Sequence, residues 1–241
     1  MTVIAMWAHP RAVSTAFLRM MAERGDVTVV HEPLVLLTDH GEVSVPGPEG
    51  DGDAVVLRSP GELLAHLAAL GERRPVFFKD TLEYHYRYLF DHPERIAGFR
   101  HTFIVRDPAR AIASHHAVKP EVTCPEIGYE HQWDLFELAW KTTGERPVVV
   151  SAERLLADPA AVVSAYCERV GLPYVPEALS WRPGERAEWR PNRRWHLDVM
   201  ASSAFRAPER EYAVTVDNDE RLRAFHEYHL PYYERLVEHA L

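Results

Sequence analysis

The segment IAMWAHPRAVST (Ile4–Thr15) decides the fold class of this chain. Val3–Ala8 is a nearly continuous apolar run, which is typical of a strand buried on both faces of a sheet. Apolar residues then recur at helical spacing from Phe17 to Met21. A short polar turn separates the two runs. The segment therefore predicts a buried strand, a loop and a helix that begins near Ser14.

The loop between this strand and helix has the chemistry of an anion site. Ser14 and Thr15 fall at the predicted helix start, where unpaired N–H groups and the positive end of the helix dipole attract an anion. Arg11 adds a permanent charge that can bridge two phosphate or sulfate oxygens. Alternatively, Ser14 only caps the helix and Arg11 is a solvated surface residue. No G-x-x-x-x-G-K-[ST] motif is present, which disfavours an ordinary nucleotide triphosphatase.

A second segment, FIVRDPARAIAS (Phe103–Ser114), repeats this construction. Arg106 stands at the carboxyl end of a predicted strand, and Pro108 suits the first turn of the helix that follows. Arg110 and Ser114 are four residues apart and share a helix face. Pairing of Arg106 with a surface carboxylate is the structural alternative. The two segments together suggest a ligand that carries two phosphate groups.

The two segments resemble the sulfotransferases that use 3′-phosphoadenosine 5′-phosphosulfate (PAPS). In that family a P-[KR]-S-G-[ST]-T loop binds the 5′-phosphosulfate, and R-D-P with a Ser eight residues after the Arg binds the 3′-phosphate. Ala12-Val13 stands here where the family has Ser-Gly, and Arg11 replaces the commoner Lys. The resemblance implies that PAPS is the donor co-substrate. It also implies a donor site made of Arg11, Ala12, Val13, Ser14, Thr15, Arg106 and Ser114.

Later parts of the chain also resemble a bacterial subgroup of this family. These blocks are His131–Trp140, Pro147–Leu156 and Trp195–Phe205, so the resemblance covers most of the 241 residues. The implied activity is transfer of a sulfuryl group to a hydroxyl or amine of a small molecule, in secondary metabolism. A kinase-like phosphoryl transferase and a non-catalytic nucleotide-binding protein with the same fold are the alternatives.

Apolar strands and amphipathic helices alternate along the chain, which predicts a parallel sheet with crossover helices. Strands are expected over residues 3–8, 27–31, 75–79, 101–105 and 147–151, and helices over 14–24, 60–71, 81–90, 108–117, 128–143, 159–170 and about 219–240. Val35–Asp53 is expected to form a hairpin or loop. We expect an α/β, three-layer P-loop-like fold as one domain over residues 1–241, with an irregular Trp- and Arg-rich cover at about 181–210.

Polar residues follow several predicted strands, and ligands collect at the carboxyl ends of parallel strands. Lys79 and Arg11 are the candidates for stabilising charge on the departing phosphate. By the resemblance, Glu32 is the first choice for the base that takes the acceptor's proton, with His31 and His85 as alternatives. The structural alternatives are a cap for Glu32 and an ion pair with Asp80 or Glu83 for Lys79.

Composition narrows the classes of partner. The net charge of −9 disfavours nucleic acid, because binding to phosphates needs a basic face. No apolar run is long enough to span a membrane, and Cys124 and Cys167 suggest neither a disulfide nor a zinc site. We therefore expect a cytoplasmic protein that needs no metal and binds a small-molecule acceptor, with a homodimer as an option. The stretch Arg182–Arg194 is either a solvated loop or a lid over the nucleotide, and Trp195 is a candidate for contact with adenine or acceptor.

Overall fold

The computed structural model describes residues 2–48, 53–190, 192–206 and 210–241. Parts of two predicted segments lie outside the described residues. These are residues 49–52 of the expected hairpin or loop and residues 191 and 207–209 of the expected cover.

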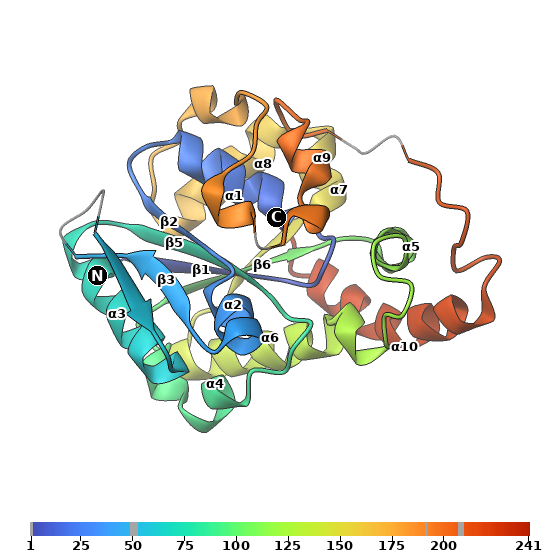
Figure 1. Ribbon diagram of the computed structural model, residues 1–241, viewed down its shortest axis with the longest axis horizontal. Coiled ribbons are helices and arrows are strands. Elements are labelled where there is room, and N and C mark those ends of the chain that lie inside the picture. The colour runs from blue at the N-terminus through green and yellow to red at the C-terminus, as the bar shows by residue number, and fades with distance from the viewer. Residues whose placement is uncertain (1, 49–52, 191, 207–209) are drawn as a thin grey trace.

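A five-stranded parallel sheet lies at the centre of the protein, in the order β2-β5-β1-β6-β7 (Figure 1). Its strands are β1 (Val3–Ala8), β2 (Thr28–His31), β5 (Val76–Thr81), β6 (Arg100–Val105) and β7 (Val148–Ser151). Every residue of β1 is buried, because β1 is the middle strand and helices cover both faces of the sheet. The predicted α/β class and the five strands of the sheet are confirmed.

Helices cover the two faces of the sheet as separate layers (Figure 1). Alternate residues of β1 point to opposite faces of the sheet: Met6 packs against the helices over residues 14–23 and 159–170, whereas Trp7 packs against the helices over residues 60–73 and 129–143. The longer helices are α1 (Ser14–Glu23), α3 (Pro60–Arg73), α5 (Pro108–His116), α6 (Tyr129–Thr143), α8 (Pro159–Val170) and α10 (Glu220–Val237). These helices were predicted, with ends that differ by a few residues.

The segment expected as a hairpin or loop contains a helix as well as a hairpin. The helix α2 (Pro33–His40) comes first, and β3 (Val43–Pro46) pairs antiparallel with β4 (Ala54–Leu57). Proline at the first helical position and Gly41 after the last one are the usual helix boundaries, so the sequence contained this signal. Like α2, the short helix α7 (Ala152–Ala157) was not predicted from the sequence; it follows β7 directly.

The prediction of a helix over residues 81–90 is wrong for the first half of that range. The strand β5 continues to Thr81, and only α4 (Arg87–Asp91) is helical. Tertiary contacts hold the residues between them: the Leu82 N–H donates to Ala8 O, and the Leu82 carbonyl receives a hydrogen bond from His131 Nδ1. Because these non-local partners satisfy the backbone of Leu82, the helical periodicity of the local sequence is overridden.

The described residues between about 181 and 206 form an irregular cover above the sheet. It contains short turns and the one-turn helix α9 (Leu197–Met200), and Figure 1 shows this orange segment beside α1. An isolated bridge between Ser180 and Ala204 closes the cover on itself. No helix in the described part of the chain is both long and apolar enough to cross a membrane.

Candidate functional site

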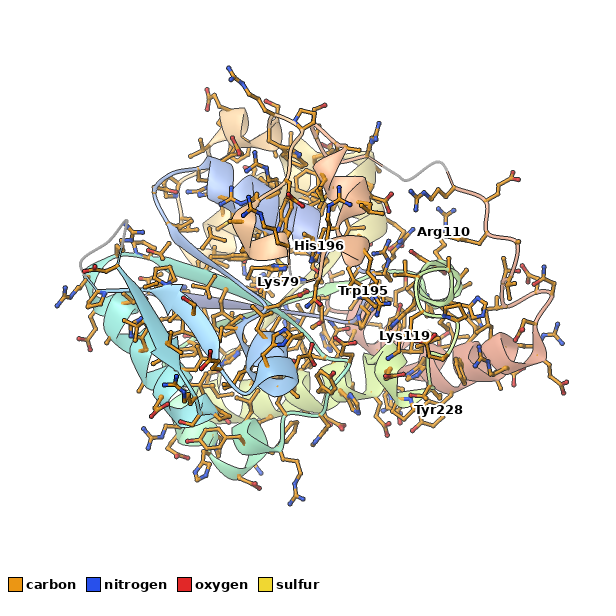
Figure 2. All side chains as sticks on the ribbon, in the orientation of Figure 1. Lys79, Arg110, Lys119, Trp195, His196 and Tyr228 are labelled. Carbon is orange, nitrogen blue, oxygen red and sulfur yellow. The ribbon has the colours of Figure 1, made fainter. Side chains whose placement is uncertain are left out.

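A cavity of about 590 Å³ opens at the carboxyl ends of β1, β2 and β5, beneath the C-terminal cover. Residues 10–16, which form the loop after β1 and the first turn of α1, line one wall. Lys79 lines the cavity from β5, and Trp195 and His196 line it from the cover. Figure 2 shows these three side chains near the middle of the molecule, where the cover approaches the sheet. The topology therefore creates the crevice expected for a parallel sheet.

The loop after β1 has the backbone shape of an anion nest. Arg11 and Val13 adopt left-handed conformations, with φ of 68° and 69°. In the described chain, no backbone carbonyl accepts a hydrogen bond from the N–H groups of residues 12–15. Free N–H groups next to the positive end of α1 favour a bound anion. A β-branched Val side chain is strained at positive φ. The described non-glycine residues with positive φ are Arg11, Val13 and Glu32, and all three line the cavity.

Arg11 connects this loop to the second predicted phosphate segment and to the cover. Its Nε donates to Ser114 Oγ at 2.9 Å, and one terminal nitrogen donates to Trp195 O at 2.9 Å. The other terminal nitrogen lies 3.3 Å from a carboxylate oxygen of Asp198, whose second oxygen pairs with Arg210 at 3.0 Å. An acidic side chain of the protein therefore occupies a position on Arg11 that a phosphate oxygen of a ligand could take.

Arg106 lies under the loop after β1 rather than on the cavity wall. Its guanidinium donates to Arg11 O at 3.1 Å, and its backbone N–H donates to His9 Nε2 at 3.0 Å. Because Nε2 accepts, the proton of neutral His9 is on Nδ1, which donates to Pro10 O at 2.9 Å. Burial lowers the pKa of His9 to about 3, so the ring stays neutral. His9 thus joins the two phosphate segments, a positioning role that sequence reasoning missed.

Glu32 and Lys79 form a buried ion pair on the cavity wall. The register places His31 of β2 opposite Lys79 of β5, and the Glu32 N–H donates to Lys79 O at 2.7 Å. Burial alone would raise the pKa of Glu32, but the Lys79 ammonium and the nearby histidines outweigh it and lower that pKa. Glu32 occupies the N-cap position of α2, yet its side chain makes no capping hydrogen bond. In this structure its carboxylate is the counter-ion of Lys79.

The expected alternative partners of Lys79 do not pair with it. Successive residues of a strand point to opposite faces, so Asp80 faces away from Lys79. Asp80 instead accepts hydrogen bonds from Leu34 N at 2.7 Å and Val35 N at 3.1 Å, in the first turn of α2. Burial raises the pKa of Asp80 to about 8. Asp80 therefore holds the helix that carries Glu32 at its start.

Three buried side chains next to this ion pair could offer ligand atoms to a metal. One atom each of His31, Glu32 and His196 lies within 4.8 Å of the other two, and the two Nε2 atoms are 3.3 Å apart. Both Nδ1 atoms are buried without a partner among the described residues, whereas a metal-bound His usually donates through its second nitrogen. Burial lowers the pKa of His31 to about 3 and that of His196 to about 4. Since Lys79 already neutralises Glu32, the cluster fits a pair of hydrogen-bonded neutral imidazoles better than a metal site. That the protein's activity needs no metal stays a prediction.

The comparisons with known proteins agree with this geometry. A model of the family described as "Sulfotransferase domain" matches residues 1–240. This chain belongs to the sulfotransferase family. Two curated Arabidopsis thaliana proteins are similar to it, the branched-chain-amino-acid aminotransferase-like proteins 2 and 1, each at 25% identity over 217 and 228 residues. The matches cover 87% and 86% of this chain but 37% of each relative, so the chain spans just over a third of their length.

Solved bacterial sulfotransferases have the same fold. The sulfotransferase domain of the Synechococcus olefin synthase aligns with a TM-score of 0.59 at 16% identity, covering 94% of both chains. A sulfotransferase from Alicyclobacillus acidocaldarius aligns with a TM-score of 0.52 at 16% identity, covering 98% of this chain and 96% of the other. The sulfotransferase domain of the curacin biosynthetic pathway aligns with a TM-score of 0.52 at 13% identity, covering 99% and 97%. At this identity the likeness establishes the fold.

The sulfotransferase brings most of the predicted site residues together. Arg11, Ala12, Val13, Ser14, Thr15, Glu32 and Lys79 line the cavity, and Ser114 reaches it through Arg11. His31 is buried behind Glu32, and His85 is exposed, stacks on Phe90 and lies off the cavity wall. The roles assigned to these residues remain predictions.

Only part of the arginine-rich stretch of the sulfotransferase lines the cavity, and its role as a lid stays a prediction. Within it, Arg194 lines the cavity, whereas Arg186 pairs with Glu188 and Arg193 with Glu185. Four further cavity residues that were not predicted from the sequence to take part in binding or catalysis are Glu83, Asp198, Arg206 and Arg210. No local motif marks these four, because they reach the cavity from a turn and from an irregular segment.

Proposed function

We propose that this sulfotransferase moves a sulfuryl group from PAPS to a hydroxyl or amine of a small molecule. The observation that carries the proposal is the contact between Arg11 Nε and Ser114 Oγ, 2.9 Å, which joins the two expected phosphate segments at one end of the sheet. A donor that carries a 5′-phosphosulfate and a 3′-phosphate on one ribose needs two anion sites close together at the same end of the sheet. Arg11, placed between them, supplies charge to either group.

The reacting end of the donor would lie over the Glu32–Lys79 pair. In the reaction a bond forms between the acceptor atom and sulfur, and the bond from sulfur to the phosphate oxygen breaks. Negative charge grows on that oxygen, where fixed cations and backbone N–H groups stabilise it. Among the described residues, Glu32 is the only hydrogen-bonding partner of the Lys79 ammonium, so further N–H donors remain for the departing phosphate. The N–H groups of the loop after β1 complete this positive field.

The test is calorimetric titration with 3′-phosphoadenosine 5′-phosphate (PAP), with ATP and magnesium as the control. We expect PAP to bind without a divalent metal and ATP to bind far more weakly, because the second anion site has no partner on ATP's ribose. A screen with sulfur-35 PAPS and candidate metabolites then identifies the acceptor. Activity that a chelator abolishes and magnesium restores would favour phosphoryl transfer. PAP binding without transfer to any acceptor or to water would favour a non-catalytic nucleotide-binding protein.

A further inference from the structure

Glu83 lies on the cavity wall, and its carboxylate has no hydrogen-bonding or ionic partner in the part of the chain that the structure describes. It lies two residues after β5, half-buried, in the turn that replaces the expected helix. Across the described residues, no hydrogen bond or ion pair involves its side chain. Burying a carboxylate without a partner is unfavourable, so such a group on a ligand cavity is a candidate for function rather than for stability.

The charges that face Glu83 are mostly negative. Glu32 and Asp39 approach it from the two ends of α2, Glu126 approaches from a turn before α6, and Lys119 follows α5. Lys119 is itself paired with Glu126. Burial, together with Glu32 and Asp39, raises the pKa of Glu83 to about 7 although Lys119 opposes the shift. A carboxylate in this environment accepts a proton far more readily than an ordinary surface glutamate.

The other titratable groups at this end of the cavity are already engaged. Glu32 is bound to Lys79, and its pKa is lowered. His196 lines the cavity, but its Nε2 is 3.3 Å from His31 Nε2. Asp39 is exposed and accepts a hydrogen bond from Tyr84 OH at 2.7 Å. Glu83 therefore has the free lone pairs that a general base requires.

We propose that Glu83 accepts the proton of the acceptor in the transfer step. This inference rests on the proposed function. As the acceptor oxygen or nitrogen bonds to sulfur, its proton moves to the Glu83 carboxylate, and the sulfur–oxygen bond to the nucleotide breaks with its electron pair leaving on PAP. The resulting carboxylic acid returns the proton to solvent through the cavity. Glu32 then serves as the counter-ion that orients Lys79 toward the departing phosphate.

The test compares Glu83→Gln with Glu32→Gln, and uses Glu121→Gln as the matched control. Glu121 is exposed, lies in the same stretch of chain as Lys119 and is off the cavity wall, so it loses the same charge without touching the site. Turnover is measured from pH 5 to 9 with sulfur-35 PAPS, using phenol and benzyl alcohol as probe acceptors, because neither hydroxyl group titrates in this pH range. PAP affinity is measured for each variant. Carbon-13 NMR of labelled glutamate, assigned with Glu83→Gln, follows the titration of Glu83 in the PAP complex.

We expect Glu83→Gln to lower kcat by about 10²–10⁴ with PAP affinity unchanged, which is the usual effect of losing a general base. The fall in activity below about pH 7 should disappear in this variant and persist in Glu32→Gln and Glu121→Gln. Wild-type turnover with an unchanged acidic limb in Glu83→Gln would overturn the proposal. Loss of the acidic limb in Glu32→Gln alone would assign the base to Glu32.

The proposed function and this inference fail in different ways. Absence of PAP binding in the wild-type protein refutes the proposed function. If PAP binds but neither probe accepts the sulfuryl group, the NMR titration decides. A Glu83 carboxyl that titrates like an ordinary glutamate, at about 4–5, overturns the inference. A carboxyl that titrates near 7 supports it.

Discussion

Asp198 provides the sharpest test of how the donor enters. Its carboxylate holds Arg11 at 3.3 Å and Arg210 at 3.0 Å, and we expect a phosphate of the proposed donor to displace it from Arg11; we call the Asp198–Arg11 contact the latch. Asp198→Asn removes the charge and preserves the shape of the side chain. The side chain of Arg11 is 14% exposed and that of Asp198 36%, so the pair is partly screened by solvent.

The expected magnitude follows from the population of the open latch. A partly exposed ion pair is worth about 1 kcal/mol after screening. A latch of about that strength leaves roughly 15% of molecules with Arg11 free, and the apparent Kd of the donor is the intrinsic Kd divided by that fraction. Asp198→Asn should therefore bind PAP about sixfold more tightly, measured by calorimetry in 0.15 M salt.

The matched control is Asp91→Asn, which removes one negative charge from an exposed position at the end of α4. Asp91 does not line the cavity, and charges beyond a Debye length of about 8 Å are largely screened at this salt concentration. We expect wild-type affinity for this variant. Unchanged or weaker PAP binding by Asp198→Asn would refute the latch, and weaker binding would mean that Asp198 holds the cover in its donor-binding position.

Three further predictions concern the loop and the buried histidines. Arg106→Ala should weaken PAP binding by roughly tenfold to a hundredfold, because the variant loses the hydrogen bond by which the Arg106 guanidinium holds Arg11 O in the loop after β1, and a hydrogen bond from a charged group is worth about 1.5–3 kcal/mol. Arg110→Ala removes the same charge from an exposed position of α5 and should bind PAP normally; equal calorimetric affinities for both variants would contradict the prediction. Val13→Gly should raise the free energy of unfolding by about 0.5–1 kcal/mol, because relief of left-handed backbone strain exceeds the entropy that glycine loses on folding. Ala16→Gly in the same helix should lower the free energy of unfolding. A lower urea midpoint for Val13→Gly than for the wild type would show that the backbone at residue 13 is not strained. The protein should lose stability as the pH falls from about 6.5 toward 3, because six buried histidines have lowered pKa values and stay neutral in the native state while the unfolded chain takes up protons. The raised pKa values of Asp80 and Glu83 oppose this trend with two protons, so a urea midpoint at pH 5 equal to that at pH 7 would refute the balance. The histidines are His9, His31, His101, His115, His196 and His229.

Elements whose signal is local were predicted from the sequence. β1 is recognisable because a strand buried on both faces must be apolar at successive positions, as Val3–Ala8 is. The start of α5 was recognisable because Pro108 suits the first helical position, and Asp107 caps that helix by accepting from Arg110 N. The segment at residues 82–86 was misassigned because the partners of Leu82 come from β1 and α6.

The candidate site, like the fold, was predictable from the sequence where its signal is local and not where it depends on tertiary contacts. The residues of the two phosphate segments could be named from the sequence, because loop chemistry at a strand end depends on neighbours along the chain. Their contact could not, because Arg11 and Ser114 are 103 residues apart. The Lys79–Glu32 pair depends on strand register, and the latch on Arg11 depends on where the cover folds back.

The sequence alone determined the α/β class, the strands of the sheet and the residue types that can hold two anions, since burial and helix starts leave periodic local patterns. Only the tertiary structure decided which charges neutralise one another. Electrostatic pairing depends on distance and on exclusion of water, and both arise when segments remote in sequence pack together. For that reason Glu32 has a counter-ion in Lys79, whereas Glu83, four residues after that lysine, faces the cavity with a raised pKa.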